Sequence, residues 1–158
     1  MNRKSPIRSA AVLLCGLLLF LCASSAAFAA GNKQVTLRNE EDSAAKVALL
    51  YLTEKREWRV QGWYAMEMDP NYEKTLDIAL PDLADNMLYI CVLFEEPTSE
   101  QYVDEDQEFK KATITDDDFS YILGRETPEG ANPRQVKFFK VAPIENGRLW
   151  LNLGSGAG

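Results

Sequence analysis

The chain of 158 residues contains no histidine at all. This absence excludes Ser-His-Asp and Cys-His nucleophile arrangements, imidazole general bases and zinc sites with histidine ligands. The sequence also lacks a Gly-x-Ser-x-Gly elbow, a phosphate-binding glycine loop and a dinucleotide-binding glycine motif. Because the commonest catalytic and nucleotide-binding machineries are missing, we expect a protein that is not an enzyme.

Long apolar runs are also absent, except at the N-terminus. Three basic residues precede an uncharged apolar run over residues 10–23, and Ala27-Phe28-Ala29 follows it. A basic start, a short apolar core and an Ala-x-Ala end predict a secretory signal peptide over residues 1–29. An uncleaved anchor is the alternative, but the run is shorter than the roughly 18 to 20 residues that cross a bilayer. We therefore expect an exported protein, periplasmic or extracellular, with no stable membrane insertion after cleavage.

Cysteine is scarce, and one sign of charge dominates. Cys15 and Cys22 would leave with the signal peptide, so Cys91 remains alone and no intrachain disulfide is expected. Cys91 lies in an apolar run, which predicts a small buried side chain. The formal net charge is −7, and removal of the basic signal makes it more negative. This charge disfavours binding to nucleic acid or to anionic membrane surfaces; the expected partner is an envelope protein or a glycan.

What remains after residue 29 is rich in strand-forming residues. Runs of β-branched and aromatic residues between turn residues predict an all-β domain over residues 30–153. The predicted strands are Val35–Asn39, Ala45–Thr53, Trp58–Met68, Thr75–Leu80, Met87–Glu95, Phe109–Thr115, Arg134–Ala142 and Arg148–Leu153. We expect an antiparallel β-sandwich or sandwich-like barrel of about seven or eight strands. Residues 154–158 form a Gly-rich tail that we expect to be disordered.

Two local segments refine this prediction. Glu145-Asn146-Gly147 is typical of a tight hairpin turn and predicts that the last two strands pair. Residues 116–123 begin with three aspartates and end before Gly124, a pattern that favours one short helix there.

The hairpin over residues 45–68 predicts a binding face. If Thr53 lies opposite Trp58, one face of the second strand is apolar and forms the core. That face carries Trp58, Val60, Tyr64, Met66 and Met68. The other face carries Trp63, Arg59, Gln61 and Glu67, and an indole on a polar face can stack on a sugar ring or a peptide side chain. These four residues are the predicted ligand site; the alternative is that a loop or second layer covers Trp63.

Carboxylates are abundant between residues 95 and 118, and they leave three alternatives open. In the first, Ca²⁺ binds to oxygen ligands drawn from Asp104, Asp106, Glu108, Asp116, Asp117 and Asp118. The spacing resembles the start of an EF-hand loop, although Phe109 stands where glycine is required. In the second, two of these acids serve a carboxylate-based hydrolase. In the third, the segment is a solvated acidic loop, and no cofactor is bound.

Several of these residues also carry a family resemblance. The pattern is Asn39, Val47-Ala48, Tyr51, Trp58, Gly62-Trp63-Tyr64 and Pro70. It resembles the family of small exported bacterial proteins known as domain of unknown function 1036. That family commonly has cysteines near the opening Asn and after a Pro-Gly turn, whereas this chain has none there and has Asn71 in place of the glycine. The resemblance implies an exported β-domain and no particular activity. We therefore expect a soluble, non-enzymatic binding or structural module of the cell envelope.

Overall fold

The structure, a computed structural model, describes residues 33–71, 73–95 and 107–154. The predicted signal peptide and residues 155–158 of the predicted tail lie outside the described residues. The described part contains nine β-strands. They are β1 (Lys33–Asn39), β2 (Ala45–Thr53), β3 (Trp58–Met66), β4 (Thr75–Leu80), β5 (Leu83–Phe94), β6 (Phe109–Ile114), β7 (Phe119–Ile122), β8 (Arg134–Lys140) and β9 (Arg148–Leu153). No helix that could cross a membrane occurs among the described residues.

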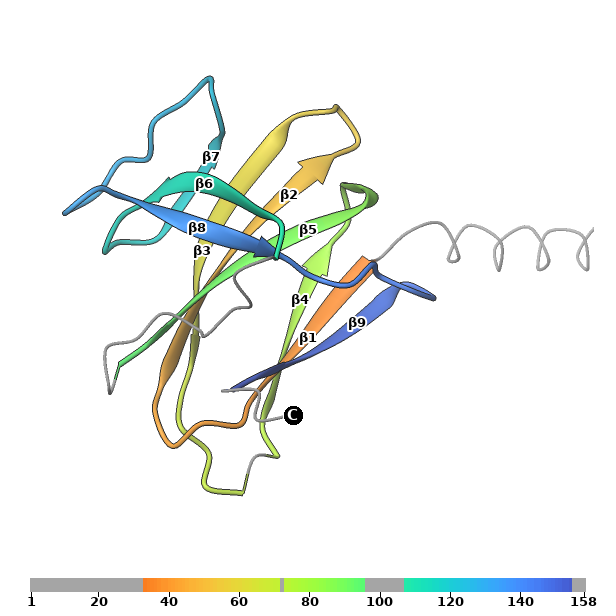
Figure 1. Cartoon of the computed structure of the whole chain (residues 1–158), viewed down its shortest axis with the longest axis vertical. Helices are drawn as coiled ribbons and strands as arrows, with labels where there is room; N and C mark the ends of the chain where they lie inside the picture. Colours follow the sequence, from red (N-terminus) through yellow and green to blue (C-terminus); the bar gives the residue numbers. More distant parts are fainter. Residues whose placement is uncertain (1–32, 72, 96–106, 155–158) are drawn as a thin grey trace, which may run out of the picture. The chain divides into compact units, whose positions relative to one another are not determined.

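The strands form two sheets (Figure 1). The six-stranded sheet has the order β6-β8-β5-β2-β3-β7, and all of its pairs are antiparallel. The three-stranded sheet has the order β4-β1-β9, in which β1 pairs antiparallel with β4 and parallel with β9. The predicted all-β, sandwich-like fold is confirmed.

The predicted hairpin between the last two strands is wrong, because β8 and β9 belong to different sheets. The turn itself is present: Asn146 and Gly147 have φ values of 52° and 80°, as a tight primed turn requires. However, the chain has already left β8 at Lys140, and the turn delivers β9 to the side of β1. The leucines of β9 then join the core that β1 lines.

The two faces of the six-stranded sheet carry separate cores, and β2 contributes to both. Val47, Leu49 and Tyr51 join the cluster shared with the three-stranded sheet. Ala48 and Leu50 join the second cluster, on the opposite face, with side chains from β3 and from β5 to β8. Each buried leucine of this kind contributes about 1.5–3 kcal/mol through the area removed from water. Cys91 is buried in the second cluster, as its apolar surroundings predict.

A β-bulge in β3 corrects the predicted hairpin register. Val47 pairs with Tyr64 as predicted, but Leu49 pairs with Gln61, so Ala48 lies opposite both Gly62 and Trp63. Because of the extra residue, even-numbered side chains of β3 before the bulge point to one face of the sheet, and those after the bulge point to the other. No single apolar face therefore runs along this strand.

The predicted core face divides accordingly. Trp58 and Val60 contact the second cluster, whereas Tyr64 and Met66 contact the first. Met68 lies beyond the end of β3 and is 47% exposed. The prediction that Met68 continues the core face is wrong.

The edge strands of the six-stranded sheet, β6 and β7, are joined by side chains. The Tyr121 hydroxyl donates to the Thr113 carbonyl at 2.8 Å and accepts from the Thr113 N–H at 3.0 Å. The Trp63 indole N–H donates to the Thr115 carbonyl at 2.8 Å. These bonds connect β6 and the residue after it with β7 and β3, and the second cluster lies inside the curled sheet.

The predicted short helix over residues 116–123 is wrong, because β7 occupies Phe119–Ile122. Phe119 and Tyr121 are buried and Ser120 is exposed, which is the two-residue alternation of a strand. The three aspartates do not cap a helix. Instead, they accept hydrogen bonds from residues of β3, of β8 and of the loop before β8.

Candidate functional site

The structure places the four predicted ligand residues in different surroundings. Trp63 is half-buried, and its ring packs edge-to-face on Phe119 at a centroid distance of 5.4 Å. Gln61 lines a shallow pocket of about 330 Å³ together with Trp63 and Asp118. Arg59 lies 4.0 Å from Asp82 instead.

Glu67, the fourth residue, is exposed near Lys74. The Trp63 indole itself packs on Phe119 of β7 and donates to the Thr115 carbonyl. β7 and the segment before it therefore cover part of this indole, as in the alternative that a loop or second layer covers Trp63.

The predicted cation ligands are also separated. Asp104 and Asp106 lie outside the described residues. Glu108 precedes β6 and accepts hydrogen bonds from Lys140 and Tyr89. The three aspartates follow the other end of β6.

Each aspartate already accepts a hydrogen bond from the chain itself. Asp116 accepts from the side chains of Asn132 and Arg134, both at 2.7 Å. Asp117 accepts from the Ala131 N–H at 2.8 Å, and Asp118 from the Trp63 N–H at 3.3 Å. Within residues 33–71, 73–95 and 107–154, no three acidic or cysteine side chains form a group that could hold a metal ion. Binding of Ca²⁺ at residues 95–118 stays a prediction.

Hydrogen bonds also set the acidity of these carboxyl groups. The Lys140 ammonium, and then the Tyr89 hydroxyl, lower the pKa of Glu108 by hydrogen bonding to its charged form. Asn132, and then Arg134, lower the pKa of Asp116 in the same way. A general acid needs a raised pKa, whereas the hydrogen bonds of Glu108 and Asp116 lower theirs.

A different polar surface, the outward face of the three-stranded sheet, has the features of a binding site. One set of alternate residues, including Val35, Leu37 and Leu149, points into the core. The other set forms three rows across the sheet, because each outward residue of β1 has one partner in β4 and one in β9. The rows are Arg148, Gln34 and Ala79; Trp150, Thr36 and Asp77; and Asn152, Arg38 and Thr75. We call these nine residues the outward face.

Trp150 is the one aromatic residue of the outward face. Its side chain is 57% exposed, the largest value among the large apolar side chains of the described residues. The Arg148 guanidinium lies 5.7 Å from the centre of its ring. Unlike Trp63, Trp150 lies on an edge strand, β9, and presents its indole to solvent.

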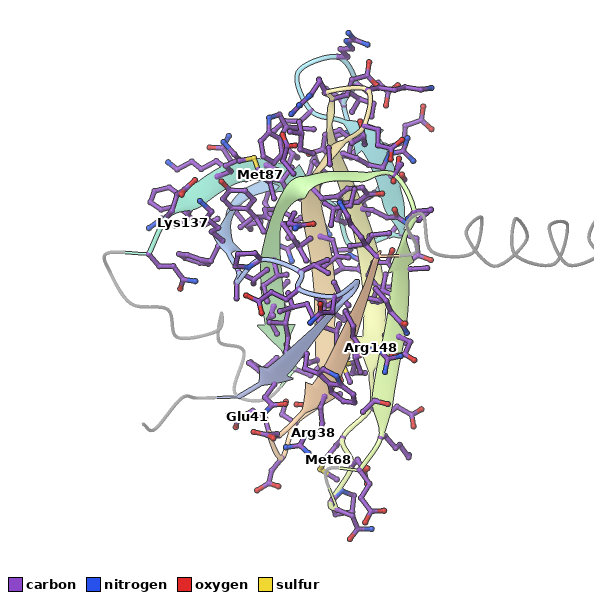
Figure 2. All side chains as sticks on the ribbon, turned by 90° about the vertical axis from the view of Figure 1, so that its right-hand side faces the viewer. Arg38, Glu41, Met68, Met87, Lys137 and Arg148 are labelled. Atoms are coloured by element: carbon purple, nitrogen blue, oxygen red, sulfur yellow. The ribbon has the colours of Figure 1, made fainter. Side chains whose placement is uncertain are left out.

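The polar neighbours of Trp150 are held by their own network. Thr36, which is buried beside the indole, donates to Asp77 at 2.6 Å. Arg148 donates to Gln34 at 3.0 Å and lies 3.8 Å from Asp77. The guanidinium and the carboxylate keep further donors and acceptors that face solvent. The surface beside the indole is therefore organised before any ligand arrives. Figure 2 shows Arg38 and Arg148 among the side chains of this part of the molecule.

A groove of about 680 Å³ adjoins Trp150. Its described lining consists of Arg38, Glu40, Asn71, Glu73, Thr75 and Trp150. We call it the Trp150 groove. Arg38 is ion-paired with Glu40, so the charges of this pair compensate. The indole, one guanidinium, two carboxylates and an amide offer a flat apolar surface and hydrogen-bonding groups of both kinds.

One wall of the Trp150 groove belongs to the connection between β3 and β4, and Asp69 fixes its shape. The carboxylate of Asp69 accepts from the N–H groups of Lys74 at 2.7 Å, Glu73 at 2.9 Å and Asn71 at 3.3 Å. Asp69 is itself buried. These backbone hydrogen bonds, that of Lys74 above all, lower the pKa of Asp69.

The groove wall should therefore loosen in acid. A lowered pKa stabilises the folded loop above the ordinary value of 3.8, and this stabilisation is lost as the pH falls through the lower folded value. We expect the Lys74 and Glu73 amides to lose protection from exchange, relative to their intrinsic exchange rates, as the pH falls below about 3.8. Asp69→Asn, which cannot carry the charge, should show the loosened wall at neutral pH as well. Amide exchange of Lys74 that is the same in the wild type and in Asp69→Asn would contradict this explanation.

The sequence-based prediction missed Trp150, although a signal was present. In Arg148-Leu149-Trp150-Leu151-Asn152-Leu153 the leucines and the polar residues alternate, which places Trp150 on the polar side of its strand. For Trp63 the same alternation predicts a polar face, but the bulge at Gly62 reverses the alternation of β3 there.

The comparisons with known proteins add no relative. No family model, no curated protein and no solved structure matches the chain. The resemblance seen in the sequence stays a prediction, and the function has to be argued from the geometry alone.

Proposed function

We propose that the chain is an exported, non-enzymatic binding module of the cell envelope that holds a glycan in the Trp150 groove. The observation that carries this proposal is the exposed indole of Trp150 on an otherwise polar sheet face. Export is supported by the signal-peptide pattern of residues 1–29. Aromatic side chains offer large, rigid contact area, so one exposed indole can carry much of a binding energy.

The surroundings of the indole favour a sugar over other ligands. A sugar ring has one apolar face for stacking and a rim of hydroxyl groups, which both donate and accept hydrogen bonds. Guanidinium, carboxylate and amide groups that match such a rim are found in Arg38, Glu73 and Asn71. Because Glu40 and Glu73 outnumber Arg38 in the lining, uncharged sugars fit the groove better than acidic ones.

Trp150→Ala tests the proposal. We expect binding of a neutral oligosaccharide to weaken at least about thirtyfold, the effect of losing a central aromatic contact. The free energy of unfolding should change by less than about 0.5 kcal/mol, because Trp150 is exposed. Isothermal calorimetry with hits from an array of neutral, amino and acidic oligosaccharides measures the first effect, and urea unfolding the second. Trp150→Phe, which keeps a ring, should fall between wild type and alanine.

Two results would contradict this function. One is the absence of any oligosaccharide that binds the wild-type protein, and the other is unchanged affinity in Trp150→Ala. The hydrolase alternative makes a different prediction, since cleavage of the bound glycan releases new reducing ends. We expect the wild-type protein to bind the oligosaccharide and to leave it intact.

A further inference from the structure

A second surface, on the hairpin of β6 and β8, has a different chemistry. The register pairs Phe109 with Phe139, Lys111 with Lys137 and Thr113 with Gln135. These six residues share one face, because Ala112, Ile114, Val136 and Phe138 point into the second cluster. The face therefore offers an aromatic pair, a cationic pair and a polar pair in succession along the hairpin. We call it the β6–β8 face. Figure 2 shows Lys137 well separated from Arg38 and Arg148, so this face is distinct from the Trp150 groove.

The cationic pair places the like charges of Lys111 and Lys137 opposite each other. Like charges directly opposite each other in a sheet are destabilising. The two strands together carry five basic residues and no acidic one, although acidic residues predominate in the chain as a whole. Of these five, Arg134 and Lys140 are ion-paired. Within the described part of the chain, Lys111 and Lys137 form no ion pair. An anionic group placed between them would relieve their repulsion.

The aromatic pair beside these lysines is partly exposed. Phe109 is 41% exposed, and its ring centre lies 6.1 Å from that of Phe139. The Lys137 ammonium lies 4.5 Å from the centre of the Phe109 ring. Since the ammonium occupies one face of this ring, the ring is a poor platform for a sugar. It suits contact with an aliphatic or aromatic side chain.

Among the residues that the structure describes, no strand pairs with the outer edge of β6. β6 is an edge strand, and the Glu108 carbonyl accepts from the Lys140 N–H across the hairpin. Because backbone direction alternates along an antiparallel strand, the N–H and C=O groups of Phe109 and Lys111 point away from β8. The N–H and C=O groups of Thr113 also point away from β8, but both are already hydrogen-bonded to the Tyr121 hydroxyl. Within the described part of the chain, the unpaired edge of β6 therefore coincides with the aromatic and cationic pairs.

We propose that the β6–β8 face binds an extended acidic segment of a partner protein, which adds to the edge of β6 as a further strand. Side chains on one face of an extended peptide recur about every 7 Å, which is also the spacing of successive pairs along the hairpin. A carboxylate of the segment lies beside Lys111, on the side of β6 away from β8, and the Lys137 ammonium, which already reaches over Phe109 of β6, approaches it across β6. An apolar side chain two residues away lies against Phe109. Main-chain hydrogen bonds provide affinity, and the two side-chain contacts provide selectivity. This site is independent of the Trp150 groove.

The probe for this proposal is a blocked peptide with two repeats of Glu-Thr-Leu-Thr, and the control peptide has Gln in place of Glu. We expect the acidic peptide to shift the backbone amide resonances of Phe109 and Lys111, with an affinity that falls as salt is added. The double variant Lys111→Gln, Lys137→Gln should weaken this binding about fivefold to tenfold. The matched control is Lys46→Gln with Lys55→Gln, which removes two exposed lysines from β2 and its following turn and should leave the affinity unchanged.

A purely structural role of the lysines is tested by urea unfolding. Because the facing charges repel, the double variant at Lys111 and Lys137 should be as stable as the wild type or more stable. Loss of stability in that variant would overturn the proposal, and so would equal binding of the glutamine peptide. Amide shifts that avoid β6 would overturn it too. Trp150→Ala should bind the acidic peptide normally, so failure of the glycan proposal is distinguishable from failure of this one.

Discussion

Replacing Trp63 by alanine is expected to lower the free energy of unfolding by about 3–5 kcal/mol, the usual cost of deleting a large packed aromatic side chain. The indole contacts Phe119 and the second cluster, and its N–H donates to the Thr115 carbonyl. Alanine removes the packing and leaves that carbonyl without its indole donor. Urea unfolding followed by tryptophan fluorescence or circular dichroism measures the loss.

Trp63→Phe is the matched control, because it keeps an aromatic ring and removes the N–H donor. It should cost about 1–3 kcal/mol, less than alanine. If Trp63→Ala kept its stability and lost affinity for a ligand, the sequence-based assignment of Trp63 to a binding face would be right, and Trp63 would not be a structural residue.

Replacing Gly62 by alanine is the second change with a large expected effect, a loss of about 1–3 kcal/mol from overpacking. A Cβ atom at this position would lie 2.9 Å from the Ala48 Cβ and 3.0 Å from the Phe119 ring. Both neighbours are fixed in the second cluster, so the bulge must shift to admit the methyl group. Thermal and urea unfolding measure the loss.

Two further variants separate this clash from a general effect of losing glycine. Gly154→Ala should be neutral, because its nearest neighbours would lie at 3.4 and 3.5 Å, ordinary contact distances. Ala48→Gly combined with Gly62→Ala should recover part of the loss, since it removes the closer of the two contacts. A Gly62→Ala protein as stable as the wild type would mean that the bulge does not hold Ala48 and Gly62 together.

Local chemistry made much of this fold predictable from the sequence. The bounds of β2, β4 and β9 match the predicted strands, because each of these runs begins and ends next to turn residues. Alternation of apolar and polar side chains also predicted the bounds of β1 and β8 to within a few residues. Each of these signals lies within the strand itself.

The errors arise where a distant contact decides the outcome. The bulge opposite Ala48 depends on how Gly62 packs against Phe119, a residue far along the chain, and the isolated glycine in β3 was its one local sign. Likewise, Asp116 resembles a helix cap in the sequence, but in the fold it binds Asn132 and Arg134. The partner of β9 is β1, at the other end of the described chain, and no turn residue could have indicated this.

Distant packing also decides which indole meets the criterion of the proposed site, an exposed indole on a polar sheet face. In the structure Trp150 meets this criterion, whereas Trp63, which the sequence favours, is half-buried. Loop residues Asn71 and Glu73 could not have been assigned to the groove, because they are positioned through their backbone N–H groups, which donate to the Asp69 carboxylate whatever side chains these residues carry. The lysine pair of the β6–β8 face required the register of two strands that β7 separates in the sequence.

The most direct test of the account is to follow the indole N–H resonances of the three tryptophans while a neutral oligosaccharide is added. The account predicts that the resonance of Trp150 shifts with saturation, while those of Trp58 and Trp63, packed against the second cluster, stay in place. Saturable binding that moves the Trp63 resonance and leaves that of Trp150 unmoved would contradict it.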